Sequence, residues 1–120
     1  MDACAFLWTE IPQDNPIPQL TRRLLKGEKM LVAEVRLGKG CHVATHSHES
    51  EQIAIMMSGK VRWVIGEDGS PEQRELLMSG GEVMHLPSNV AHGLTVLEDA
   101  VIYDVLSPVG PMGVDAMRSN

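Results

Sequence analysis

Short apolar segments separated by Gly and Pro make up most of the chain. From Lys29 onward, runs rich in Val, Ile, Leu and Met are interrupted by turn residues. The interruptions recur about every 8 to 12 residues, which is typical of strands in an all-β sandwich or barrel. No long stretch has the period of about 3.6 residues that marks an amphipathic helix. The sequence therefore predicts an all-β fold.

Eight segments have the length and composition of strands, and a jelly-roll barrel accommodates that number. The predicted strands span residues 30–37, 41–48, 52–57, 61–66, 72–78, 82–86, 92–97 and 100–106. Between them lie Gly-rich or Pro-containing turns, in which glycine supplies positive φ and proline fixes φ. At 120 residues the chain has the length of one domain.

The N-terminal segment differs from this body. Pro12, Pro16 and Pro18 each remove a backbone donor, so this stretch should lie extended over the surface. We therefore divide the chain into an N-terminal arm (1–28), a barrel (29–108) and a C-terminal tail (109–120).

One predicted strand is apolar on both faces. The run from Ile53 to Met57 is apolar at every position, whereas a strand with one wet face alternates. A second cover must come from the N-terminal arm or from a partner subunit. We predict a homodimer.

The composition excludes several classes of partner. The formal net charge of -6 provides no basic field for nucleic acid or for anionic lipid. No run of 18 apolar residues occurs, and the acidic start of the chain does not resemble a secretory signal, so we expect a cytoplasmic protein. Cys4 and Cys41 form no CxxC pair, and we expect two free thiols.

Two histidines mark a candidate metal site. His46 and His48 are two residues apart on a predicted strand, so their side chains leave the same face and can bind one ion. Such a pair alone is weak evidence, because soluble proteins often carry it as solvated polar positions.

The spacing around this pair is more specific. Five residues separate Gly40 from His46, three separate His48 from Gln52, and six separate Gln52 from Gly59. A second group follows, in which five residues separate Gly81 from Pro87 and four separate Pro87 from His92. This pair of motifs resembles those of the cupin superfamily, with Gln where the first motif usually has Glu and Asn where the second commonly has Gly. The resemblance covers residues 29–108 and implies a double-stranded β-helix, the cupin jelly roll.

In cupins of this kind the two motifs bring their ligands together inside the barrel. The resemblance therefore implies that His46, His48, Gln52 and His92 bind one divalent transition metal ion. Three imidazoles suit Zn, Ni, Fe, Mn or Cu, and the ligand types alone do not select among them. A neutral Gln52 in place of a carboxylate leaves the charge of the ion uncompensated, which favours anionic ligands.

Within the superfamily, the chain resembles short type 2, RmlC-like cupins, a group that includes the pectin-degradation protein that linearises unsaturated galacturonate. The matching stretches are 46–52, 97–100 and 104–108. The resemblance implies a role in carbohydrate metabolism, with Asp104 assisting proton transfer. The chain departs from the group at Leu106 and Gly110, where the group has Phe and Arg. Arg118 is a possible substitute for the missing guanidinium.

His85 lies on the predicted strand that enters the second motif. It could face the pocket as a proton shuttle or could pack with one nitrogen bonded, and the sequence does not decide between these positions. We include it with Asp104 as a catalytic candidate. His42 is expected to be a surface or structural residue.

Three function classes remain open from the sequence. The first is an enzyme that uses a divalent metal as a Lewis acid on a small anionic sugar or keto acid, with unsaturated uronate conversion as the leading candidate. The second is a metal-dependent dioxygenase, which the neutral Gln52 disfavours. The third is a non-catalytic module that binds a small molecule. Fold alone does not choose among them.

Overall fold

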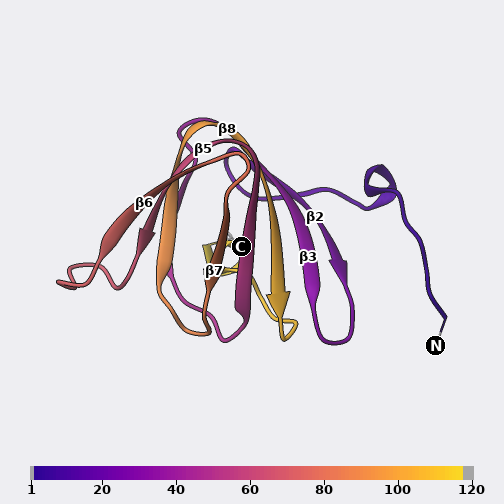
Figure 1. Ribbon diagram of the computed structural model, residues 1–120. Helices are drawn as coiled ribbons and strands as arrows, with labels where there is room; N and C mark the ends of the chain where they lie inside the picture. The colour runs from indigo at the N-terminus through magenta and orange to yellow at the C-terminus, as the bar shows by residue number, and fades with distance from the viewer. Residues whose placement is uncertain (1, 118–120) are drawn as a thin grey trace.

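The computed structural model of the chain, described for residues 2–117, consists of β-strands, connecting loops and two short 3₁₀ helices (Figure 1). In chain order the elements are η1 (Trp8–Glu10), β1 (Asp14–Ile17), β2 (Leu20–Lys26), β3 (Leu31–Leu37), β4 (His42–His46), β5 (Glu51–Ile65), β6 (Arg74–Ser79), β7 (Val83–Leu86), β8 (His92–Ser107) and η2 (Gly113–Met117). No helix within residues 2–117 has the length and apolar character needed to cross a membrane. The all-β fold predicted from the sequence is confirmed.

Two long antiparallel strands, β5 and β8, form the centre of the structure and arch over its top in Figure 1. The first half of β5 pairs with β7 and with the end of β8, and its second half pairs with β6 and with the start of β8. Strand β8 also pairs with β3 and β4. Each long strand therefore has different neighbours along its two halves.

The bend in β5 explains why the sequence predicts two strands where the structure has one. The pairing with β8 shifts register between Met56 and Val61, around Gly59. Gly59 has a φ of 86°, and a Cβ there would overlap the carbonyl oxygen of Asp99. The predicted Gly turn is thus a bulge at which the strand bends without ending.

The boundaries of the barrel differ from those expected. β2 pairs with β3 along its whole length, so the sheet begins near Asp14 and only the residues before it form an arm. At the other end, Val114 is buried in the hydrophobic core, so the segment after Pro108 packs onto the barrel mouth. Arg118 lies outside the described residues.

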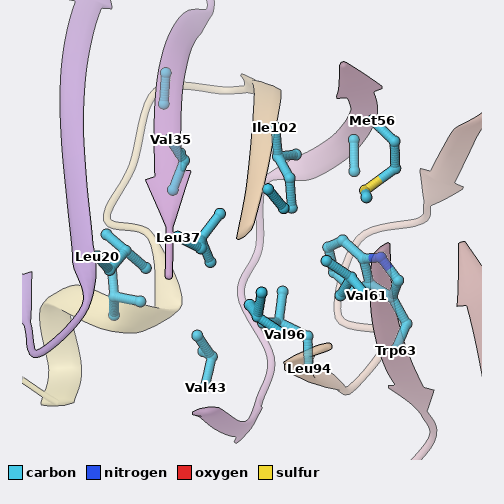
Figure 2. Packing of buried hydrophobic residues seen from close by; sticks show 14 of the residues in the cluster. Leu20, Val35, Leu37, Val43, Met56, Val61, Trp63, Leu94, Val96 and Ile102 are labelled. Carbon is cyan, nitrogen blue, oxygen red and sulfur yellow. The ribbon is translucent and has the colours of Figure 1, made fainter. Parts of the chain in front are cut away.

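The core is aliphatic, as the composition requires. Figure 2 shows buried apolar side chains from several strands, among them Leu37, Val43 and Ile102, gathered in the barrel interior. Trp63 is the one aromatic residue of the described core and is 2% exposed. Cys41 is buried among these residues as a small filler, and both cysteines are free thiols as expected.

An apolar patch remains on the outer face of β5 and β7. Ile53, Met57 and Val83 are 41%, 51% and 61% exposed. The N-terminal arm packs elsewhere on this face, where the ring of Trp8 lies against that of Tyr103 of β8 with centroids 5.9 Å apart and planes tilted by 50°. Within the described residues, the arm therefore leaves Ile53 and Met57 exposed.

We predict that this patch joins two chains in a homodimer. An Ile53→Asp change should place a charge in the interface and halve the mass measured by light scattering, because a buried unpaired carboxylate is strongly unfavourable. The matched control is Leu77→Asp on β6, since Leu77 is 59% exposed and β6 pairs with the second half of β5, beyond the Ile53 to Met57 run. A wild-type chain that is monomeric at micromolar concentration would contradict the prediction.

Candidate metal centre

Three histidines meet at one end of the barrel interior. His46, at the end of β4, is the direct cross-strand partner of His92, at the start of β8. His48 follows two residues after His46, in the turn before β5. One ring nitrogen from each of the three lies within 4.8 Å of the other two, and the group could hold a metal ion.

Hydrogen bonds fix the orientation of each ring. The Nδ1 atoms of His46, His48 and His92 lie 2.8, 2.8 and 2.9 Å from the backbone oxygens of Ala44, Ser50 and Val90. Because a carbonyl oxygen only accepts, Nδ1 must donate in every case. In the neutral rings the lone pair is then on Nε2. This is the tautomer that metal-ligating histidines adopt when a carbonyl orients them.

The surroundings favour the neutral form of these rings. Burial is the largest cause that lowers the pKa of His92 to about 4; the hydrogen bond to the Val90 carbonyl acts in the opposite direction, and the nearby His46 and His48 contribute smaller decreases. Burial also lowers the pKa of His46. Both rings are therefore neutral at pH 7, with lone pairs available for a cation.

Gln52 completes the group from β5. Its Nε2 donates to Oδ1 of Asp104 at 2.8 Å, so its Oε1 points the other way and lies 3.1 Å from Nε2 of His48. With His48 in the tautomer above, these are two acceptor atoms in contact, and a proton or a metal ion must be shared between them. The donor set, three imidazole nitrogens and one amide oxygen, fits a first-row transition metal.

Asp104 lies behind Gln52 on β8. Its side chain is 6% exposed, and desolvation raises its pKa to about 7, although the hydrogen bond from Gln52 acts in the opposite direction. The carboxyl lines the same cavity as His46, Gln52 and His92.

The cavity at this end is small and largely apolar. Its volume is about 50 Å³, and its wall is completed by core residues that include Leu20, Val43 and Trp63. The indole N–H of Trp63, next to His92 with ring centroids 6.4 Å apart, has no hydrogen-bond partner. The C-terminal residues Met112, Gly113 and Val114 also line the cavity.

Comparison with known families gives this arrangement its context. The cupin domain profile matches residues 33–106, which contain all four candidate ligands. The chain belongs to the cupin family. No curated protein matches the chain.

Solved structures agree with this cupin along most of its length. An RmlC-like cupin from Shewanella frigidimarina has a TM-score of 0.77 at 17% identity, with 90% of this chain and 93% of that chain covered. KdgF from a Halomonas species has a TM-score of 0.77 at 23% identity, with 91% and 96% covered. Oxalate decarboxylase from Bacillus subtilis, which holds Mn(II) centres, matches with a TM-score of 0.76 at 19% identity, and the match spans 86% of this chain and 28% of the decarboxylase. These likenesses confirm the jelly-roll fold.

His85 does not reach the cavity of this cupin, and its expected pocket role is wrong. On β7 the buried residues are Met84 and Leu86, so His85 points outward and is 54% exposed. Its Nε2 lies 2.7 Å from the carboxylate of Glu51. Glu49, in the turn before β5, is also exposed. His42 is a surface residue that contacts Thr95, as expected.

Sequence reasoning missed the residues that close the barrel mouth. Arg22 on β2 is 3% exposed and binds Asp115 and Asp14. An available signal was the alternation of Leu20, Arg22 and Leu24, which places the arginine on the inward face of a strand. Gly113 and Val114 carry no comparable signal, because they lie in an irregular segment.

We predict that His48→Ala empties the metal site. Loss of an outer-shell contact typically lowers metal affinity by about 10- to 100-fold, so loss of a ligand should cost at least about 100-fold. Elemental analysis of protein purified without added metal measures the change. The matched control is His42→Ala, which should keep the wild-type metal content. Equal metal content in the His48 and His42 variants would contradict the assignment.

Proposed function

We propose that this cupin is an enzyme that binds one divalent transition metal ion through His46, His48, Gln52 and His92 and acts on a small anionic sugar or keto acid. The observation that carries the proposal is the contact of two acceptor atoms, His48 Nε2 and Gln52 Oε1, beside two further neutral imidazoles. A bound divalent ion would supply Lewis-acid polarisation of a ligand oxygen.

Asp104 is placed to carry out proton transfer in the cavity. It is the carboxyl group that lines the cavity, and Gln52 holds one of its oxygens in place. A carboxyl so placed can give a proton to a ligand in the cavity or take one from it. Asp104 is therefore the proposed acid–base residue. Gln52 binds metal on one side and positions Asp104 on the other.

The charge of the ligand set supports an anionic substrate. Three neutral imidazoles and a neutral amide leave the double charge of an ion uncompensated, which attracts carboxylates. The structural likeness to KdgF supports conversion of an unsaturated uronate as the leading reaction. Zn, Ni, Fe, Mn and Cu all suit the donors. The direct test is loss of ultraviolet absorbance when metal-loaded protein is mixed with unsaturated uronates and keto acids.

We predict that Asp104→Asn lowers turnover and leaves the metal in place. General acid–base catalysis contributes about 10²- to 10⁴-fold, and asparagine can still accept the hydrogen bond from Gln52 but cannot transfer a proton. The measurements are turnover and metal content. The surface control is Asp99→Asn, which should keep full turnover because Asp99 contacts the backbone of Lys39 outside the cavity. Unchanged turnover in the Asp104 variant would refute its role.

A Gln52→Glu change separates Lewis-acid chemistry from oxygen chemistry. It adds one negative charge at nearly constant shape, so metal should be held more tightly while anionic substrates bind less well. A glutamate carboxylate also cannot donate to Asp104 as the Gln52 amide does, so turnover should fall for both reasons. A dioxygenase would keep or gain oxygen uptake, because a carboxylate stabilises the higher oxidation state of a metal. The comparison measures metal retention, uronate turnover and oxygen consumption. Oxygen uptake by wild type in step with product would replace the proposed mechanism with the dioxygenase.

A further inference from the structure

The C-terminal segment 112–116, here called the strap, crosses the mouth of the cavity. Met112, Gly113 and Val114 all form part of the cavity wall. Gly113 lies directly against His46, because a Cβ at this position would overlap the imidazole ring. The strap is thus in contact with one of the candidate metal ligands.

The size of the closed cavity is the second observation. Its volume of about 50 Å³ is enough for a few water molecules. Pockets that bind small organic ligands measure about 300 Å³ or more. A six-carbon sugar acid therefore cannot enter while the strap is in place, although an ion with a water or a triatomic anion can.

The strap is held by a buried arginine. Arg22 donates through Nη1 and Nη2 to Asp115 and through Nε and Nη2 to Asp14, and its Nη1 also lies 3.5 Å from Sδ of Met112. Asp115 in turn accepts from the backbone N–H of Met112 at 2.8 Å. These charge-assisted hydrogen bonds join the strap to β2.

Apart from this pair, the strap is attached by apolar packing and forms no strand pairing. Val114 is buried in the hydrophobic core and Met112 packs against that core, whereas η2 pairs with no strand of the sheet. The strap can therefore lift without breaking a strand ladder, but opening must break the Arg22–Asp115 pair and expose Val114.

We propose that the strap is a gate that sets the size of ligand reaching the metal centre, and that the Arg22–Asp115 pair is its latch. The inference rests on the proposed function for the identity of the ligand, but the opening of the strap does not depend on it. A ligand larger than the closed cavity binds only to the open state, so its apparent affinity is reduced by the open fraction. A ligand that fits the closed cavity is insensitive to the gate.

The test replaces Asp115 by Asn, which keeps the shape and weakens the latch. Hydrogen exchange of the peptide covering residues 112–116 should accelerate about tenfold. The reason is that a hydrogen bond to a charged group typically shifts an equilibrium by about tenfold or more, here the equilibrium between the closed and the open strap. The matched control is Glu98→Gln, an exposed carboxylate whose nearest cation, Lys60, lies 3.9 Å away on the barrel surface. Unchanged exchange in the Asp115 variant would show that the pair is not a latch.

Ligand binding then tests the gate itself. In cobalt(II)-loaded protein, visible absorption reports binding of azide, which fits the closed cavity, and of D-galacturonate, which does not. In Asp115→Asn the dissociation constant of D-galacturonate should fall about tenfold, while that of azide should change less than about twofold. Faster exchange with no gain in D-galacturonate affinity would overturn the gate.

A glycine variant provides an independent route to the open state. Gly113→Ala should lift the strap from His46 while leaving the latch charges intact, and should also favour D-galacturonate over azide. Gly38→Ala is the control, because a Cβ there has ordinary van der Waals room. Protein that takes up no cobalt would count against the proposed function, whereas the exchange measurement would still decide whether the strap opens.

Discussion

The antiparallel register between β5 and β8 is the constraint on which the fold and the site both depend. It sets Gln52 opposite Leu106 and Ala54 opposite Asp104, so Gln52 and Asp104 point into the barrel from adjacent strands. The same strand β8 begins with His92. Because side chains alternate along a strand, a slip of one residue would turn Asp104 to the outer face and separate it from Gln52. The bulge at Gly59 shifts this register, so β5 and β8 stay paired on both sides of the bend.

Much of the fold and of the candidate site could be predicted from the sequence, because the spacing of residues along a strand indicates which side chains lie on the same face of that strand. The period of a strand brought His46 and His48 together, and the resemblance of two motifs to those of cupins added Gln52 and His92. His85 could not be placed in this way, since β7 has only four residues and three of them are apolar, so its pattern fits either orientation. β1 and β2 were missed because prolines and basic residues obscure their alternation.

The strap illustrates a different limit of sequence reasoning. The residues from Pro108 to Gly113 include two prolines and two glycines, a composition that indicates an irregular loop and contains no period. What holds the strap is a contact between Arg22 and Asp115, which are 93 residues apart. A pairing of that kind depends on the folded arrangement of β2 and η2. Local pattern therefore cannot reveal it, even though each partner is an ordinary charged residue.

The apolar cavity around the site changes the strength of the electrostatic interactions within it. Its walls are largely apolar side chains such as Leu20, Val43 and Ile102, and little water fits inside, so electrostatic interactions are stronger there than in bulk water. The same environment keeps His92 neutral and makes ionisation of Asp104 costly, for both pKa shifts have desolvation as their largest cause. A cation at the histidines would relieve both the acceptor contact at Gln52 and the cost of a nearby negative charge. An anion would be attracted to that cation more strongly in this apolar, poorly hydrated cavity than in bulk water. The apolar lining and the neutral ligand set therefore act in the same direction, because both strengthen the attraction between a bound cation and an anion.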